Sequence, residues 1–426
     1  MAGLLQGQRV IVAACGSIAA VKTPLLVSAL IKEGAQVRCV VTSSGSQLVS
    51  PVALACLSRN PCFQDADQWD PSRPRPLHIE LAEWADLVIV APLSASSLAR
   101  WVHGDGQGLL ASLLLACECP VLAASAMNTA MWQHSAVQRN WSRLHDDPRV
   151  LPLAPQAGLL ACDRVGTGRM ADPECIVLAA ASTMLQADSE GKLRSDWRGK
   201  RVLVSAGPTR EPLDSVRLIS NRSSGRMGVL LAQAARFRGA DVDLVHGPLT
   251  VPDAWLEGLH CLPAFSSAAM EVCLLERQPR ADAVLMCAAV ADLRRDSSEG
   301  SPKLPKDALI KAIAQGWEQV PDLLQLLHAR RPSGQVLLGF AALAGPDEDL
   351  IRLGRQKARA KGCDLLFVNP IDRPDQGLDS ALNGGRLLGP GERLEDVPVM
   401  HKLALAHLLL DRLGRVGDQA AMSAGP

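Results

Sequence analysis

The sequence lacks a net charge, because its 44 lysine and arginine residues balance its 44 aspartate and glutamate residues. A strongly basic or acidic protein attracts nucleic acid or anionic membranes through its overall electrostatic field, and this chain has no such field. We therefore expect neither nucleic acid nor a membrane among its partners. Any site that binds phosphate groups must depend on local features of the chain.

Targeting signals and long apolar runs are also missing. The opening stretch MAGLLQGQRVIVAA lacks the charged segment, the long apolar segment and the cleavage site of a secretory signal. The apolar run at 109–116 is far too short to span a membrane. Twelve cysteines are scattered along the chain without an export signal, which predicts reduced thiols rather than a disulfide framework. Together these absences predict a cytoplasmic protein.

Short β-branched runs alternate with longer Ala- and Leu-rich helical patterns along the chain, which is typical of βαβ units and a parallel sheet. A chain of 426 residues exceeds what one hydrophobic core usually organises, so we expect two domains. The predicted fold is α/β, with two doubly wound, mostly parallel-sheet Rossmann-like domains joined by a short linker. The predicted strands are 9–14, 86–92, 120–126, 201–209, 241–248, 282–292, 335–342 and 363–369.

A polar segment at 188–199 interrupts this alternation, because it carries no apolar periodicity before the next strand begins. It predicts a linker. The first domain is then 1–187 and the second is 200–426.

Several polar segments follow or flank the predicted strands of the first half, and open α/β sheets bind ligands at the carboxyl ends of their strands. The segment ACGSIAAVKTP at 14–24 is a small-residue turn before a helix, and a Ser-rich helix start follows His78 in the segment at 76–100. Asn128 follows another strand, and a Gly-rich segment at 158–173 surrounds Cys162. A lone histidine usually has a structural role or is simply solvated. His78 is therefore a functional candidate only because the other polar segments accompany it.

In order and spacing these four segments resemble the flavin-containing cysteine decarboxylases, and in particular phosphopantothenoylcysteine decarboxylase, across about residues 7–186. The resemblance implies an FMN cofactor that oxidises the substrate thiol, so that the carbanion left by loss of CO2 can be delocalised. It implies catalytic roles for His78 and Cys162, the latter as proton donor, and substrate contacts from Asn128 and Met127. The implied cofactor-binding residues are Gly16, Ser17, Ser94 and Ser96.

The first half also departs from the family pattern. Ser125 stands for the proline of a P-A-M-N motif, and Asp163 follows the flap cysteine in place of glycine. A family segment like A-D-N-L, which helps to hold the flavin and the trimer contacts, is Gly106-Gln107-Gly108-Leu109 here.

The most specific motif of the chain is SAGPTREPLDSVRLISNRSSGRMG at 205–228, in which a loop follows a strand and small residues precede a helix whose free N–H groups favour an anion. With the segments listed next, it resembles phosphopantothenate–cysteine ligase as far as about residue 412. Those segments are CAAVADLR at 287–294, KLPK at 303–306, VPDLL at 320–324, GFAA at 339–342 and QKARAKGCDLLFVN at 356–369.

This second resemblance implies that CTP activates a carboxylate as an acyl-cytidylate, with Mg2+ (or Mn2+) as the divalent metal. Asn221 is the implied catalytic residue that stabilises the acyl-cytidylate, Arg217 contacts the substrate phosphate, and Asp292 binds the nucleotide and the metal. The implied nucleotide-binding residues are Met286, Cys287, Ala288, Asp292, Lys303, Pro321, Asp322, Leu323, Leu324, Phe340, Lys357 and Lys361.

Together the resemblances imply a bifunctional enzyme of coenzyme A biosynthesis. Its ligase domain would couple 4'-phosphopantothenate to cysteine with CTP, and its FMN domain would decarboxylate the product to 4'-phosphopantetheine. They also imply a homo-oligomer with a trimer-based decarboxylase core and dimeric ligase domains. One alternative is a flavoprotein decarboxylase with a degenerate, nucleotide-binding regulatory second domain. Another, an NAD-dependent oxidoreductase, is disfavoured because no G-x-G-x-x-G motif follows a strand.

Overall fold

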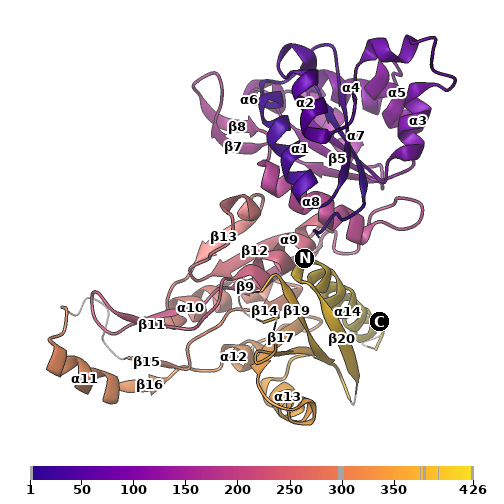
Figure 1. Cartoon of the computed structure of the whole chain (residues 1–426). Helices are drawn as coiled ribbons and strands as arrows, with labels where there is room; N and C mark the ends of the chain where they lie inside the picture. The colour runs from indigo at the N-terminus through magenta and orange to yellow at the C-terminus, as the bar shows by residue number, and fades with distance from the viewer. Residues whose placement is uncertain (1–2, 296–301, 375, 378–379, 392, 424–426) are drawn as a thin grey trace. The chain divides into compact units, whose positions relative to one another are not determined.

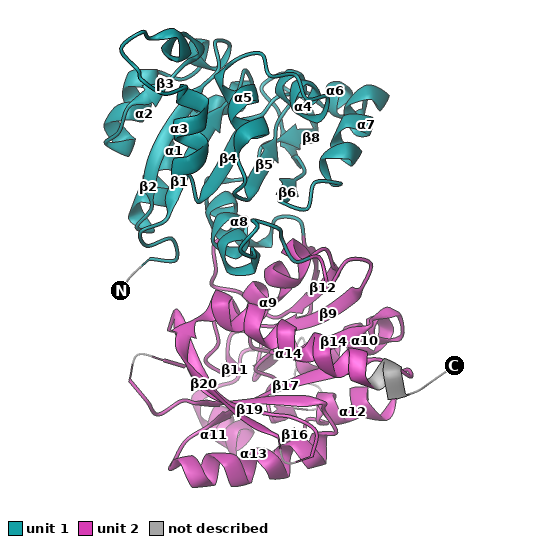
Figure 2. Cartoon of the chain, turned by 90° about the vertical axis from the view of Figure 1, so that its right-hand side faces the viewer, with its two compact units in different colours: residues 1–194, 253–258 teal, residues 195–252, 259–426 magenta. Residues whose placement is uncertain are grey.

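The computed structural model describes the chain except residues 1–2, 296–301, 375, 378–379, 392 and 424–426. Two compact units are distinguished, coloured separately in Figure 2. Unit 1 comprises Met1–Arg194 and the short segment Asp253–Gly258, and unit 2 comprises Ser195–Pro252 and Leu259–Pro426. None of the helices among the described residues is long and apolar enough to cross a membrane.

Unit 1 is built on a six-stranded parallel sheet with the strand order β3-β2-β1-β4-β5-β6. The strands are β1 (Arg9–Ala14), β2 (Gln36–Val41), β3 (Cys62–Phe63), β4 (Leu87–Leu93), β5 (Val121–Ser125) and β6 (Val150–Leu153). The central strands read as continuous apolar runs because helices cover both faces of the sheet. The strand order reverses between β1 and β4, which is where doubly wound sheets bind ligands.

Helices α3, α4, α5 and α7 pack on one face of this sheet, and α1, α2 and α8 lie on the other. A separate hairpin of β7 (Gln156–Leu159) and β8 (Val165–Arg169) precedes α8. The helices are α1 (Thr23–Lys32), α2 (Pro51–Ser58), α3 (Leu77–Trp84), α4 (Ala95–Val102), α5 (Leu109–Ala116), α6 (Thr129–Gln133), α7 (Ser135–Leu144) and α8 (Pro173–Gln186), with 3-10 helices η1 (Ile18–Lys22), η2 (Gly45–Gln47) and η3 (Asp65–Trp69).

Unit 2 contains an eight-stranded sheet in the order β13-β12-β9-β14-β17-β18-β19-β20 (Figure 1). Its first six strands are parallel, and β19 and β20 extend the sheet as antiparallel strands beyond β18. The strands are β9 (Arg201–Ala206), β12 (Asp241–His246), β13 (His260–Pro263), β14 (Ala283–Met286), β17 (Val336–Leu343), β18 (Leu365–Pro370), β19 (Leu382–Leu388) and β20 (Leu394–His401).

One face of this sheet is covered by α9 and α14, and the other by α10 and α12, with α13 against its β17–β19 side. An arm of two short antiparallel pairs, β10–β11 and β15–β16, extends from the sheet together with α11 (Figure 1). The remaining bounds are α9 (Arg226–Phe237), α10 (Ser267–Arg277), α11 (Lys306–Ala314), α12 (Leu323–Ala329), α13 (Asp347–Lys361), α14 (Lys402–Ser423), β10 (Arg210–Pro212), β11 (Leu218–Ser220), β15 (Leu293–Arg295), β16 (Trp317–Gln319), η4 (Asp253–Leu256) and η5 (Gln278–Arg280).

The predicted fold class is confirmed, since both units contain a mostly parallel sheet between helical layers. Each predicted strand is present, but the one expected at 282–292 already ends at Met286. The residues that follow leave the sheet because their backbone N–H groups bond to side chains. The Ser205 hydroxyl accepts from the N–H groups of Cys287 and Ala288, each at 3.1 Å.

Candidate functional site

A pocket of about 550 Å3 lies in unit 1 beside the carboxyl ends of β1 and β4. Gly16 follows β1 in this pocket, and Ser94 and Ser96 follow β4. These three predicted cofactor residues therefore meet where the strand order of the sheet reverses. Ser17, the fourth, does not line the pocket among the residues described.

The lining of this pocket combines an anion site with flat apolar surfaces. The Ser94 hydroxyl accepts from the Ser97 N–H at 3.3 Å and so caps α4, whose other early N–H groups lack partners within the helix. Arg100 supplies a cation on the same helix, and Trp69 and Trp101 supply indole rings. A helix N-terminus with a guanidinium suits a phosphate, and indole surfaces suit a planar ring, so these residues fit a flavin nucleotide.

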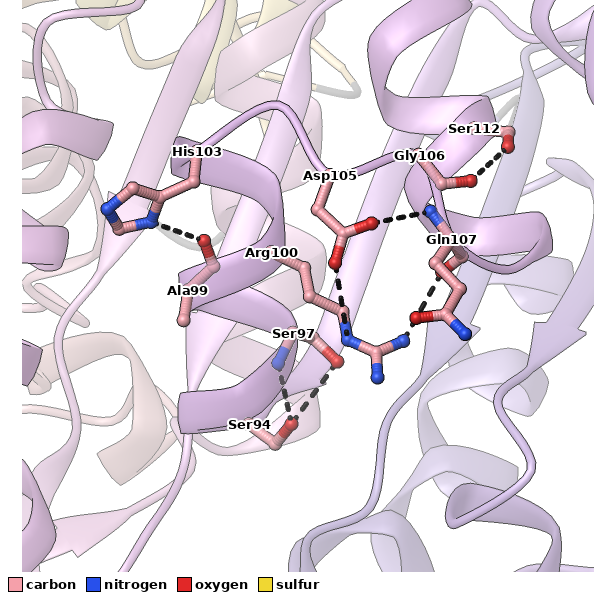
Figure 3. Close-up of polar contacts among 9 residues, drawn as sticks. All are labelled: Ser94, Ser97, Ala99, Arg100, His103, Asp105, Gly106, Gln107 and Ser112. Carbon is pink, nitrogen blue, oxygen red and sulfur yellow. Dashed lines mark hydrogen bonds and ion pairs between the residues drawn. The ribbon is translucent and has the colours of Figure 1, made fainter.

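The segment that departs from the family pattern forms one wall of this pocket, and Figure 3 shows its polar contacts. Asp105 Oδ1 accepts from the Gln107 N–H at 2.8 Å, and the Arg100 guanidinium donates to the Gln107 carbonyl at 3.3 Å. The Ser112 hydroxyl donates to the Gly106 carbonyl at 2.7 Å. The substituted segment is thus tied to the helices on both of its sides.

Two predicted residues of the decarboxylase half contact each other. The Asn128 side-chain amide donates to the Cys162 thiol at 3.4 Å, while its Oδ1 accepts from the Ala130 N–H at 2.9 Å and caps α6. Cys162 lies in the turn between β7 and β8 and is exposed. The Met127 N–H donates to the Gly168 carbonyl at 3.1 Å, which attaches the β7–β8 hairpin next to Asn128.

His78 lies apart from both groups among the described residues. It is half-buried at the start of α3, and it neither lines the 550 Å3 pocket nor takes part in the hydrogen bonds of Asn128 and Cys162. Among the described contacts, His78 is therefore linked neither to the pocket nor to the pair of Asn128 and Cys162.

A second pocket, of about 670 Å3, lies in unit 2 beside the carboxyl ends of β9, β14, β17 and β18. It gathers residues from Asn221 to Lys402, which belong to several loops. The predicted residues that line it are Asn221, Met286, Cys287, Ala288, Asp292, Pro321, Asp322, Leu323, Leu324, Phe340, Lys357 and Lys361.

Two hydroxyls buried in unit 2 shape the loop that carries several of these residues. Ser205 receives the N–H groups that follow β14, and Thr209 Oγ1 accepts from the Ala291 N–H at 2.9 Å. The Asn221 amide donates to the Val290 carbonyl at 3.0 Å, so the amide is fixed against the same loop. Burial raises the pKa of the Cys287 thiol to about 12, and the nearby Lys402 ammonium opposes this rise.

Charged residues reach this pocket from α13, from the starts of α9, α12 and α14, and from the loops that carry Arg222 and Asp292. Lys357 and Lys361 lie four residues apart on α13 and both line the pocket. The Lys361 ammonium pairs with Asp322 at 3.0 Å, and the Asp322 carboxylate also caps α12 through the Leu324 N–H at 3.1 Å. Asp292 is exposed, and no cluster of three potential metal-ligating side chains occurs in the part of the chain that the structure describes. Mg2+ commonly takes one or two carboxylates with substrate phosphates and waters, so Asp292 fits such a metal.

Arg217 and Lys303 are not among the described residues that line this pocket. Instead they belong to neighbouring parts of the arm, held by the buried Asp214. Asp214 Oδ2 accepts from the Arg217 guanidinium at 3.0 Å and from the Leu304 N–H at 3.1 Å, beside the exposed Lys303. Burial raises the pKa of Asp214, but hydrogen bonds from the Val216, Leu304 and Arg217 N–H groups outweigh burial and leave it lowered.

Sequence reasoning missed Lys402 and Asn383, which also line the second pocket. The Lys402 side chain is buried, and its ammonium donates to the Gly377 carbonyl at 2.7 Å. Lys402 is the first residue of α14, where the helix dipole disfavours a cation. That unfavourable position, before an apolar helical run, was the signal available in the sequence.

Comparisons with known proteins cover both units. The chain matches the family described as the DNA/pantothenate metabolism flavoprotein C-terminal domain over residues 197–416, and the Flavoprotein family over residues 2–185. It is 33% identical over 422 residues to the coenzyme A biosynthesis bifunctional protein CoaBC of Bacillus subtilis, covering 98% of this chain and 99% of the relative. The protein of that name from Escherichia coli is 34% identical over 418 residues, covering 96% and 97%.

A solved structure of the C-terminal domain of a coenzyme A biosynthesis bifunctional protein CoaBC is 25% identical, with a TM-score of 0.43, and covers 53% of this chain and 99% of that one. The two family matches and the near full-length relatives confirm the resemblances noted in the sequence. The chain belongs to the family of bifunctional coenzyme A biosynthesis proteins and is an enzyme with a flavoprotein decarboxylase half and a ligase half.

Proposed function

We propose that the 670 Å3 pocket of unit 2 binds CTP and Mg2+ and there activates 4'-phosphopantothenate as an acyl-cytidylate, which cysteine then attacks. The single observation that carries this proposal is that the pocket gathers twelve of the residues that the family resemblance implicates. A pocket of this size accommodates a nucleotide.

The charge and position of each residue in this pocket suggest a separate role for it. Lys357 and Lys361 would neutralise the triphosphate, and Asp292 would help to hold the metal that bridges its oxygens. The Asn221 amide, fixed against Val290, would donate to charge developing on the reacting carbonyl. The arm would bring Arg217 and Lys303 to the substrate and the nucleotide.

For unit 1 we propose FMN as cofactor and phosphopantothenoylcysteine as substrate, with 4'-phosphopantetheine as product. When bound, FMN supplies the two-electron oxidation of the substrate thiol that makes decarboxylation possible. Gly16, Ser94, Ser96 and Arg100 would hold its phosphate end. Asn128 would orient the substrate, and Cys162 would deliver a proton to carbon after CO2 is lost.

We also propose that the decarboxylase site is completed by another copy of the chain. His78 lies away from the pocket in a single copy, and Trp69, which lines the pocket, is 82% exposed. A neighbouring subunit would cover this indole and supply the missing groups. This supports a homo-oligomeric decarboxylase core, for which we propose a trimer, and we propose further that the ligase domains pair as dimers and that the enzyme is cytoplasmic.

The decisive experiment supplies 4'-phosphopantothenate, cysteine, CTP and Mg2+ to FMN-loaded protein and follows the products by mass spectrometry. We expect 4'-phosphopantetheine, CMP and pyrophosphate. Formation of phosphopantothenoylcysteine without its decarboxylation would contradict the proposal for unit 1. Release of 4'-phosphopantetheine from added phosphopantothenoylcysteine, without any CTP turnover, would favour a regulatory second domain.

A further inference from the structure

The wall of the unit 1 pocket that departs from the family pattern begins with an uncapped helix. Helix α5 starts at Leu109, and its N-cap residue Gly108 has no side chain with which to bond the first N–H groups. Gly108 has a φ of +97° and a ψ of 162°, a conformation that is essentially restricted to glycine. A helix start without a local cap leaves its N–H groups in need of another acceptor.

That acceptor comes from a different part of the chain. Asp65, at the start of η3, accepts from the Leu109 N–H through Oδ1 at 2.8 Å. Its second oxygen accepts from the Ser43 hydroxyl at 2.7 Å. A Cβ on Gly108 would lie 3.0 Å from Asp65 Oδ1. The carboxylate of Asp65 therefore lies directly beside the position that a side chain at residue 108 would take.

Both partners of Asp65 belong to walls of the pocket. Ser43 lies with Thr42 and Ser44 on the loop after β2, and Gln107, Gly108 and Leu110 lie at the start of α5. The carboxylate therefore joins Ser43 to Leu109, and so connects two parts of the pocket lining that lie far apart in the sequence. Asp65 itself lines the pocket between them.

We propose that Asp65 is a positioning residue that fixes the start of α5 and so maintains the width of the flavin pocket. Its carboxylate supplies the cap that Gly108 cannot, although Asp65 is far away in the sequence. This explains how the altered segment can still form a pocket wall. The proposal rests on the proposed function in one respect, namely that the molecule bound there is FMN.

Three substitutions separate this role from the alternatives. Asp65→Ala removes both hydrogen bonds and should weaken FMN binding about tenfold, the effect expected if FMN binding has to restore the order that a lost cap removes from the start of α5. Asp65→Asn keeps an acceptor for Leu109 and a donor for the Ser43 oxygen, so its affinity should stay within about threefold of wild type. Asp67→Ala is the matched control, because Asp67 lies on η3 but bonds only to the nearby Gln64 N–H at 2.7 Å among the contacts described.

The measurement is the dissociation constant of FMN from the full chain, by quenching of flavin fluorescence, with far-ultraviolet circular dichroism as the check on folding. Wild-type affinity in Asp65→Ala, or equal weakening in Asp67→Ala, overturns the proposal. A large loss in Asp65→Asn also overturns it, because the charge and not the bridge would then matter. If wild type itself does not bind FMN, the proposed function of unit 1 fails instead. Should Asp65→Ala not fold, Ser43→Ala cuts the other half of the bridge, and unchanged affinity there overturns the proposal.

Discussion

The two units share one strand order and differ in how much of a site a single copy contains. Read along the sheet, β3-β2-β1-β4-β5-β6 of unit 1 corresponds to β13-β12-β9-β14-β17-β18 of unit 2, and each pocket lies at the carboxyl ends of the central strands. In unit 2 the sheet continues into β19 and β20, which bring Asn383 and Lys402 to the pocket. The described sheet of unit 1 ends at β6, and neither His78 nor Cys162 lines its pocket among the described residues. The same framework therefore supports a pocket that gathers most of its predicted residues within one chain and another that, in our proposal, is completed by a neighbouring copy.

The largest effect is expected from Cys162→Ser, which tests whether the sites of the two units act independently. A hydroxyl is a far weaker acid than a thiol, so proton delivery to carbon should fail and decarboxylation should fall about a thousandfold. Ligation measured as CTP-dependent pyrophosphate release should be unchanged. Loss of both activities in a variant that folds normally would show that the two sites are not independent.

The converse test is Asn221→Asp in unit 2. It replaces an N–H donor by a carboxylate next to the reacting carbonyl, and loss of one such donor typically costs about a hundredfold or more in rate. We expect pyrophosphate release or acyl transfer to fall by that amount in single-turnover experiments. Decarboxylation of supplied phosphopantothenoylcysteine is the internal control, and a fall in that rate would contradict separate sites.

A smaller effect is expected from Asp214→Asn, which acts through the arm. Asparagine can still accept from the Val216 and Arg217 N–H groups, but its amide would point donors at the Leu304 N–H and at the Arg217 guanidinium. The KM for 4'-phosphopantothenate should rise about tenfold, with a smaller change in the KM for CTP. Asp349→Asn, which loses only a surface pair with Arg352, is the matched control. Unchanged KM values together with a lowered melting temperature would mean that Asp214 only stabilises the fold.

The smallest effect should come from Lys402→Met, which keeps the length of the side chain and removes its charge. Among the described lining residues, Lys402 is the third lysine of the pocket, with Lys357 and Lys361, and each would attract the triphosphate of the proposed CTP. The dissociation constant of CTP should rise about fivefold at low salt, and the difference should shrink at high salt. A salt-independent loss would point to packing of the buried chain instead.

Most strands of the two sheets could be predicted from the sequence. The residues that line the two pockets could be predicted less completely. Apolar runs such as 9–14 and 363–369 identified buried parallel strands, because a strand covered on both faces has no polar alternation. The end of β14 at Met286 depends on Ser205, 81 positions earlier, and that distance hides it from local patterns. Asp65 and Asp214 escaped notice for the same reason, since each acts on backbone far away in the sequence.

The hydrogen bond between Asn128 and Cys162 has a consequence for how tightly substrate binds to the decarboxylase half. With Oδ1 on Ala130 and the amide on the thiol, both ends of the Asn128 side chain are engaged before any substrate arrives. The thiol is thus an internal competitor for the amide. If Asn128 binds the substrate as proposed and must release the thiol to do so, part of the intrinsic binding free energy goes into that release, and the apparent affinity is then weaker than the final contact alone would give. In the proposed mechanism, a thiol released in this way would be free at the moment when a proton has to be delivered.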